Sequence, residues 1–301
     1  MPVVNYTNKH NPALAEFVAS HDNTTTEIHD LCLSTFQGVL GQPDLDPTVN
    51  CLVLEDAGEI KGLALVFREF PIGRSIIEIM TAPELADSPD EVELVRRALA
   101  LTEAAKLTVA HVCVMPDSGR NKVLEQVGFT KVRTYLDMLW NEDQLPNLEL
   151  PQGFSVRSFQ KGDTPLLTRV QNDAFTGSWG FCPNTENQIE YRTQMPNTSH
   201  AGIVFMFEGD NPAGYCWTVL VPGDNGIRGI IGMIGVVPDY RGKGVSRHIL
   251  HAGMKHLRSI GLAEIGLEVD GNNDPAVGLY KSVGFKVMGE RHWFERVLPG
   301  T

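Results

Sequence analysis

The sequence predicts a mixed α/β protein built from two copies of one fold. With 301 residues, the chain is long enough for about two domains, each able to bury a core. The pair Gly284-Phe285 has a counterpart at Gly128-Phe129, 156 residues earlier, and the segment 234–238 has a counterpart at 79–83, 155 residues earlier. Self-similarity at a nearly constant offset indicates an internal duplication.

The two copies are separated by a linker-like stretch. Residues 141–153 (NEDQLPNLELPQG) contain two prolines and many polar residues, with no helical or strand period. We therefore predict domains at 1–142 and 153–301, joined by a linker at 143–152.

The second half can be divided into elements in chain order. Apolar runs and helical periods predict strands at 154–159, 201–208, 213–220, 228–237 and 264–269, helical segments within 164–191, helices at 243–259 and 275–283, and two terminal strands at 286–290 and 293–297. This order suits a sheet that is antiparallel at first and ends in a parallel pair around the long helix. We expect the segment 173–183 and a terminal hairpin with His292, Trp293 and Glu295 to line an acceptor pocket.

The stretch 230–250 (IIGMIGVVPDYRGKGVSRHIL) is typical of a phosphate site. A strand leads through Pro238 into the turn 241–246 (RGKGVS), and a helix follows. Glycines let backbone N–H groups approach an anion, and the start of a helix adds positive charge. The glycine spacing fits neither a Walker loop nor a Rossmann fingerprint. Alone, the turn could also be an ordinary strand-to-helix connection.

A second motif follows at 267–285 (LEVDGNNDPAVGLYKSVGF). The two motifs, in this order and spacing, resemble two signatures of the GNAT superfamily of N-acyltransferases. These are the acetyl-CoA loop Q/R-x-x-G-x-G/A, in its variant R-G-x-G-x-[GS] after a V-x-P strand end, and the L-x-V…N…L-Y…G-F signature. The resemblance covers roughly residues 153–297. It implies a GNAT fold, in which two parallel strands splay apart around the pantetheine arm, with acetyl-CoA as co-substrate.

The first copy lacks the features that carry chemistry in the second. Where the second has RGKGVS, the first has 84–90 (ELADSPD), with three acidic groups and no glycine, and Leu124 stands at the position of Tyr280. Acidic groups repel a pyrophosphate. We expect two tandem GNAT folds, the N-terminal one degenerate. The arrangement resembles the double-GNAT family that includes mycothiol synthase, although no residue selects an inositol sugar.

The resemblance implies a set of cofactor contacts. Backbone amides of the turn would hold the pyrophosphate, Arg241 and Lys243 would add charge, the strand end would bind the pantetheine amides, and a backbone N–H near Val236 would polarise the thioester. The expected cofactor residues are Ile234, Gly235, Val236, Arg241, Gly242, Lys243, Gly244, Val245, Ser246, Asn273 and Tyr280. Arg241 and Lys243 could instead be surface cations, and Asn273 could be a turn or capping residue.

Two residues are candidates for proton transfer. The resemblance implies that the Tyr280 hydroxyl protonates the departing thiolate, although a tyrosine there could simply pack the helix onto the sheet. Glu268 interrupts an apolar strand, so its carboxylate faces a cavity or is buried at a cost. A partly buried glutamate would have a raised pKa and could serve as general base, directly or through water. An ion pair with Arg228, Arg291 or a histidine is the alternative.

Composition excludes several other classes. The formal net charge of −12 argues against nucleic acid, which needs a basic face. Five cysteines without a C-x-x-C pair, and His248 and His251 without a third ligand, indicate no metal site. No run of 18 apolar residues and no signal peptide are present, so we expect a cytoplasmic monomer or homodimer with no membrane partner.

The function that follows is an acetyl-CoA-dependent N-acetyltransferase. The expected acceptor is a primary amine of a small molecule or an aminoacyl conjugate, which attacks the thioester directly in a ternary complex. The spacing of Glu268 and Tyr280 also resembles the alanine N-acetyltransferases of ribosomal proteins, so a protein N-terminus is an alternative acceptor. A non-catalytic acyl-CoA-binding regulatory module remains a third interpretation.

Overall fold

The structure, a computed structural model, describes residues 1–20, 25–223 and 226–299. It divides into two compact units. Unit 1 comprises Met1–Tyr135 and the C-terminal segment from Glu290, and unit 2 comprises Leu136–Gly289. The division therefore falls ahead of the predicted linker at 143–152, and the end of the chain returns to unit 1. Strands β6 (Thr130–Trp140) and β12 (Lys286–Val297) each contribute residues to both units.

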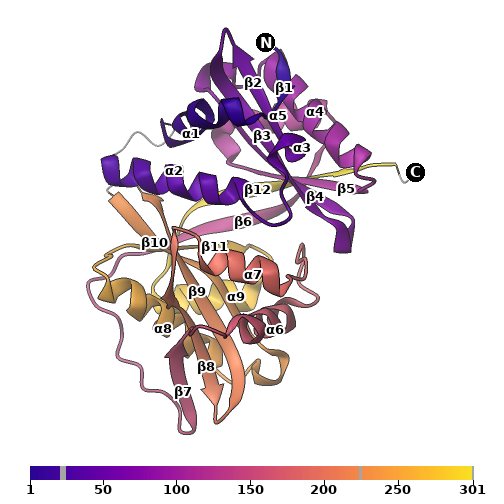
Figure 1. The fold of residues 1–301 in the computed structure, drawn as a ribbon. Helices are drawn as coiled ribbons and strands as arrows, with labels where there is room; N and C mark the ends of the chain where they lie inside the picture. Colours follow the sequence, from indigo (N-terminus) through magenta and orange to yellow (C-terminus); the bar gives the residue numbers. More distant parts are fainter. Residues whose placement is uncertain (21–24, 224–225, 300–301) are drawn as a thin grey trace. The chain divides into compact units, whose positions relative to one another are not determined.

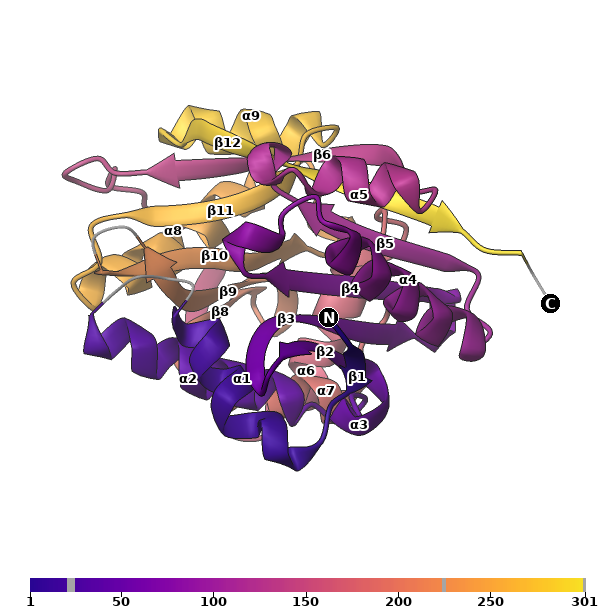
Figure 2. The same ribbon diagram turned by 90° about the horizontal axis from the view of Figure 1, so that it is seen from above.

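Unit 1 is a sheet covered by helices on both faces. Its strands are β1 (Val3–Asn5), β2 (Cys51–Asp56), β3 (Glu59–Glu69), β4 (Arg74–Thr81) and β5 (Val109–Val114), in this spatial order, followed by the C-terminal part of β12. Its helices are α1 (Asn11–Ser20), α2 (Thr26–Leu40), α3 (Pro47–Asn50), α4 (Pro89–Ala104) and α5 (Arg120–Gln126). One core lies under α4 and α5 and another under α1 and α2. Figure 2 shows the strands of unit 1 with these helices around them.

Unit 2 follows the predicted element order (Figure 1). Its elements are β7 (Phe154–Ser158), α6 (Thr164–Phe175), α7 (Glu186–Thr193), β8 (Thr198–Glu208), β9 (Asn211–Gly223), β10 (Gly226–Val236), α8 (Val245–Ser259), β11 (Ile265–Asp270) and α9 (Asp274–Val283). Strands β7 to β10 are antiparallel, and β10 pairs in parallel with β11. Helices α8 and α9 pack on one face, and α6 and α7 on the other.

The two units repeat one another in register. In unit 1, β4 and β5 pair in parallel from Arg74↔Val109 to Ile76↔His111, and in unit 2, β10 and β11 pair from Gly229↔Ile265 to Ile231↔Leu267. These pairs lie at the offsets of 155 and 156 residues that the sequence motifs give. The duplication of one fold is confirmed.

Helix α8 places its N-terminus at the end of β10. Its buried face includes Ile249, Leu250, Met254 and Leu257, each at most 1% exposed. Burying a side chain of this size stabilises the fold by about 1.5–3 kcal/mol. At Gly253, a Cβ would lie 2.3 Å from the Sγ atom of Cys216, so glycine lets the helix approach β9 closely. This packing fixes the position of the turn that precedes the helix.

The predicted terminal hairpin is wrong, because β12 is one continuous strand. The polar residues 289–291 resemble a turn, but the strand goes on and pairs with β5 from His292↔Val114 to Val297↔Val109. Phe294, 2% exposed, anchors it in the core of unit 1. Trp293 packs against the ring of His111, and Nε2 of the same ring lies 2.9 Å from Oε2 of Glu295, within hydrogen-bond distance. These contacts place the three side chains in unit 1, and the lining of an acceptor pocket by this segment stays a prediction.

Candidate active site

The site begins where β10 leaves β11. The two strands pair only as far as Ile231↔Leu267 among the described residues, while β10 continues to Val236 and β11 to Asp270. A β-bulge against β9 lies between Ile231 and Met233. A bulge bends and twists its strand, which directs the end of β10 away from its neighbour. The edge of β10 beyond Ile231 therefore offers backbone groups to another extended molecule.

The turn after β10 is open and uncapped. Gly242 and Gly244 have φ values of 74° and 77°, which favour glycine, and a Cβ added at either would meet nothing within 4 Å. Gly244 is the N-cap of α8, and no side chain caps the helix. The first N–H groups of a helix lack partners within it. The turn can thus hold an anion on its backbone amides, as the sequence predicts.

The two cations of the turn take up different positions. The guanidinium of Arg241 donates to the carbonyl oxygen of Ala174 at 2.9 Å and to that of Val236 at 3.3 Å. Lys243 places its Nζ atom 5.0 Å from the ring centre of Tyr240. Arg241 therefore ties the turn to α6 and to the end of β10, while its charge stays beside the glycines.

The end of β10 is packed from both sides. Ile234 and Val236 join the core under α8, whereas Gly235 faces α6. A Cβ at Gly235 would lie 2.7 Å from the Cβ of Ala174 and 3.0 Å from Cε1 of Tyr215. Glycine is required here for helix α6 to approach the strand. Val245, 2% exposed, is a core residue that anchors the start of α8, while Ser246 is half-buried.

Tyr280 lies in α9 and is 6% exposed. Its ring packs on Phe285 with centroids 5.9 Å apart. Burial, and to a lesser extent Cys216, raises the pKa of its phenol well above the ordinary value. Within the part of the chain that the structure describes, its hydroxyl makes no hydrogen bond. Tyr280 therefore packs the helix onto the sheet, and its raised pKa keeps the hydroxyl protonated at neutral pH.

Asn273 caps α9, since its side chain accepts a hydrogen bond from the N–H of Ala276 at 3.2 Å. The residue is exposed. The capping alternative is thus observed, and it uses only the oxygen of the carboxamide.

Glu268 is exposed, whereas Leu267 and Val269 on either side of it are buried. Successive side chains of a strand point to opposite faces, so its carboxylate lies on the face away from the core under α8. The expected partial burial is wrong. Arg228, one of its predicted partners, forms an ion pair with Glu264 at 3.3 Å.

Sequence reasoning missed a buried polar cluster on the α6 face. Gln171, 1% exposed, donates from Nε2 to the Sδ atom of Met233 at 3.2 Å, and the hydroxyl of the fully buried Tyr215 donates to the same sulfur at 3.8 Å. The Oε1 atom of Gln171 is buried without a hydrogen-bond partner. The available signal was a glutamine on the apolar face of α6, between Leu167 and Ala174.

Unit 1 fills the corresponding turn with its own carboxylate. Asp87, at the position of Gly242, has a φ of 60°. The fully buried Glu91 accepts hydrogen bonds from the N–H of Asp87 at 3.0 Å, from the hydroxyl of Thr81 at 2.9 Å and from Nε of Arg120 at 2.7 Å. A side-chain anion therefore occupies the start of α4, where unit 2 presents free amides.

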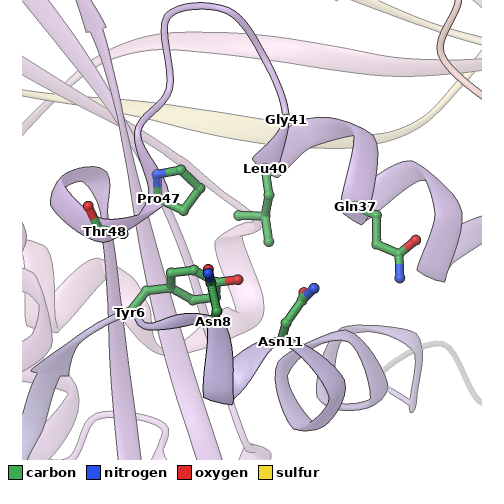
Figure 3. A pocket seen from close by; sticks show the side chains of 8 residues that line it. All are labelled: Tyr6, Asn8, Asn11, Gln37, Leu40, Gly41, Pro47 and Thr48. Atoms are coloured by element: carbon green, nitrogen blue, oxygen red, sulfur yellow. The ribbon is translucent and has the colours of Figure 1, made fainter.

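Each unit contains a cavity lined by polar side chains. In unit 2, a cavity of about 370 Å³ lies between α6 and the segment after β10, and its lining includes Arg169, Asp173, Thr176 and Asp239. In unit 1, a smaller cavity of about 210 Å³ has a carboxamide-rich lining (Figure 3). Its residues are Tyr6, Asn8, Asn11, Gln37, Leu40, Gly41, Pro47 and Thr48. None of the predicted site residues belongs to this second cavity.

Residues 1–20, 25–223 and 226–299 contain no group of three or more His, Cys, Asp or Glu side chains arranged to hold a metal ion. All five cysteines lie in this described part, and no disulfide joins them. Burial raises the pKa of the Cys216 thiol to about 12, so this thiol is unreactive at neutral pH. Across the same residues, no helix is long and apolar enough to cross a membrane.

Comparison with known proteins agrees with the geometry. Residues 165–285 match the model of the acetyltransferase (GNAT) family. The mycothiol acetyltransferase of Geodermatophilus obscurus is 33% identical over 179 residues, which are 56% of this chain and 56% of that protein. The mycothiol acetyltransferase of Saccharopolyspora erythraea is 26% identical over 265 residues, covering 81% of this chain and 84% of that protein.

A likeness of fold covers the whole chain. The structure of a tandem GNAT protein from the clavulanic acid biosynthesis pathway matches with a TM-score of 0.73 at 13% identity, covering 100% of this chain and 99% of that one. The matched segment spans only about half the length of the first relative, although it spans most of the second. These matches place a segment of the acetyltransferase (GNAT) family within unit 2, in a chain whose sequence resembles the mycothiol acetyltransferases and whose fold is similar to that of a tandem GNAT protein.

Proposed function

We propose that the chain is an acetyl-CoA-dependent N-acetyltransferase with a single active site in unit 2. The observation that carries the proposal is the uncapped turn of Gly242 and Gly244 at the end of a strand that has left its parallel neighbour. Coenzyme A has both groups that such a site would bind, an anionic pyrophosphate for the turn and an extended pantetheine arm for the free strand edge. Domain 1–142 is its degenerate partner, and domain 153–301 carries the chemistry.

Coenzyme A would bind along the path that these elements set. The amides from Gly242 to Ser246 would hold the pyrophosphate, with Lys243 beside it as a mobile cation and Arg241 as an anchor of the turn. The backbone of Ile234, Gly235 and Val236 would pair with the two amides of the pantetheine arm, as an added strand does. The free carboxamide nitrogen of Asn273 would donate to the same arm.

The acetyl group would move in one step within a ternary complex. The lone pair of the acceptor nitrogen forms a bond to the thioester carbon, the carbon–sulfur bond breaks, and the electron pair leaves with the sulfur. A backbone N–H of β10 between Met233 and Val236 would stabilise the negative charge on the carbonyl oxygen. Tyr280, whose raised pKa keeps it protonated, would donate its proton to the thiolate. Glu268, or a water molecule, would accept the proton that the amine loses.

A small cationic amine suits the unit 2 cavity. Asp173 and Asp239 contribute two carboxylates to its lining against the one guanidinium of Arg169, and this excess of negative charge favours the ammonium form of an amine before it binds. Asp173 also belongs to the segment 173–183 that the sequence predicts for the acceptor pocket. Two relatives are mycothiol acetyltransferases by name, so a mycothiol precursor is one acceptor to test within the wider class of small amines and aminoacyl conjugates.

The test is a mass-spectrometric assay of acetylated product. The purified chain is incubated with acetyl-CoA and a panel of small primary amines, aminoacyl sugars and short peptides with free N-termini. Acetylation of small amines or aminoacyl conjugates is expected. Acetylation of the peptides alone would show that the acceptor is a protein N-terminus and not a small amine. Saturable binding of CoA without turnover on the whole panel would contradict catalysis and leave a binding module.

A further inference from the structure

The side chains of Gln171, Tyr215 and Met233 form a cluster beside β10. None of the three has a role in the proposed transfer of the acetyl group. Three separate elements, α6, β9 and β10, bring these side chains together. Among the described residues, the Met233 sulfur is the hydrogen-bond partner of both Gln171 Nε2 and the Tyr215 hydroxyl. Methionine is normally a flexible gap-filler. Two buried donors on one sulfur instead hold this side chain in a single position.

Met233 lies at the vertex of the opening between β10 and β11. It follows the bulge and comes two residues after Ile231, the last residue of β10 that pairs with β11. From Met233 to Val236, a strand rises about 10 Å at about 3.3 Å per residue. An extended arm whose phosphate end lies on the turn and whose two amides follow this stretch brings its thioester close to Met233. This placement rests on the proposed function.

The side of the strand toward which an acyl tail can point is fixed by packing. On the α8 face, Tyr280, Ile231 and Ile249 are at most 6% exposed and fill the core. On the α6 face, Met233 is only partly buried, and Gln171 and Tyr215 close the space behind it. The tail of an acyl group at the vertex would therefore meet the Met233 side chain first.

We propose that Met233, held by Gln171 and Tyr215, limits the length of the acyl group that the enzyme transfers. The side chain leaves room for a methyl group at the thioester and excludes longer tails. Truncation at this position would open space for one or more methylene groups. One methylene in an apolar pocket changes discrimination by about 10- to 200-fold.

The experiment compares Met233→Ala and Met233→Val with the wild type on acetyl-CoA and propionyl-CoA, with one amine acceptor. The expected result is that the wild type prefers acetyl-CoA and that Met233→Ala lowers the ratio of the two kcat/KM values by about tenfold or more. Met288→Ala is the matched control, because Met288 is 67% exposed, and its ratio should stay at the wild-type value.

The outcomes separate this inference from the proposed function. An unchanged ratio in an active Met233→Ala enzyme would overturn the role of Met233. If Met233→Ala fails to fold by circular dichroism, Met233→Val decides by the same ratio. If the wild type transfers no acyl group at all, the proposed function fails, and calorimetric dissociation constants for acetyl-CoA and butyryl-CoA decide instead. The inference is supported if the wild type binds acetyl-CoA more tightly than butyryl-CoA and if this difference in dissociation constants is smaller in Met233→Ala. The same difference in the wild type and in Met233→Ala contradicts it.

Discussion

Replacing Gly244 by alanine should weaken coenzyme A binding far more than it weakens the fold. Gly244 has a φ of 77°, and a Cβ added there would meet no heavy atom within 4 Å. Left-handed backbone costs an alanine about 1–2 kcal/mol. A loss of 1 kcal/mol lowers Tm by about 2–4 °C in chains of 150–250 residues, so a decrease of a few degrees is expected.

The effect on coenzyme A has a different origin and size. The added methyl group occupies the space that the pyrophosphate needs, and each hydrogen bond to a charged group contributes about 1.5–3 kcal/mol. Losing one such bond raises Kd by about tenfold or more, since 1.4 kcal/mol corresponds to a factor of ten. Isothermal titration calorimetry with CoA measures this change directly.

Gly261 provides a matched control at the other end of α8. Its φ is 89°, and a Cβ there also meets nothing within 4 Å. Gly261→Ala therefore carries the same kind of backbone strain without approaching the turn. The expected pattern is a similar decrease of Tm in both variants, with a weakened Kd for CoA only in Gly244→Ala. Wild-type affinity in Gly244→Ala, or equal weakening in Gly261→Ala, would refute the assignment of the turn.

Three further predictions follow from single side chains. Tyr280→Phe should lower kcat by about 10²- to 10⁴-fold while Kd for CoA stays constant, as steady-state kinetics and calorimetry would show; an unchanged kcat would remove its role as acid. Glu91→Gln should destabilise unit 1 by about 3–5 kcal/mol in urea unfolding, because Arg120 is left beside a neutral partner, and wild-type stability would contradict a structural role for this ion pair. Burial lowers the pKa of His111 in the folded chain. Between the two pKa values the unfolded chain therefore binds a proton that the folded chain does not. The contribution of His111 to folding stability is present above about pH 6.5 and is lost as the pH falls through the lower pKa of the folded state. His111→Gln should flatten this dependence in unfolding measurements between pH 7 and 5, and an unaltered slope would count against the assignment.

Much of unit 2 could be predicted because its motifs are local. Gly242 and Gly244 are glycines for a backbone reason, their positive φ, and this reason is visible in the sequence as a strand, a turn and a helix start. The offsets of 155 and 156 residues between the halves reappear in the register of the two parallel strand pairs. The turn residues and the internal repeat are therefore sufficient to predict the fold class and the position of the candidate cofactor turn.

Side-chain environments that depend on distant partners could not be predicted in this way. Glu268 alternates with buried neighbours, and only the completed sheet shows that its face is exposed. The polar residues 289–291 resemble a turn, but pairing of Trp293 with Cys113 of β5 keeps β12 continuous. In the sequence, Met233 is an ordinary apolar residue of a strand. Its hydrogen bond from Gln171, 62 positions earlier, depends on the packing of α6 against β10 and is visible only in the structure.

The number and location of coenzyme A sites test the central claim most directly. Calorimetry should give one CoA per chain, and hydrogen–deuterium exchange should show protection on binding at the backbone amides of residues 234–246, with no change at residues 84–91. Binding of two CoA molecules per chain, or protection at 84–91, would contradict the conclusion that unit 2 alone carries the active site.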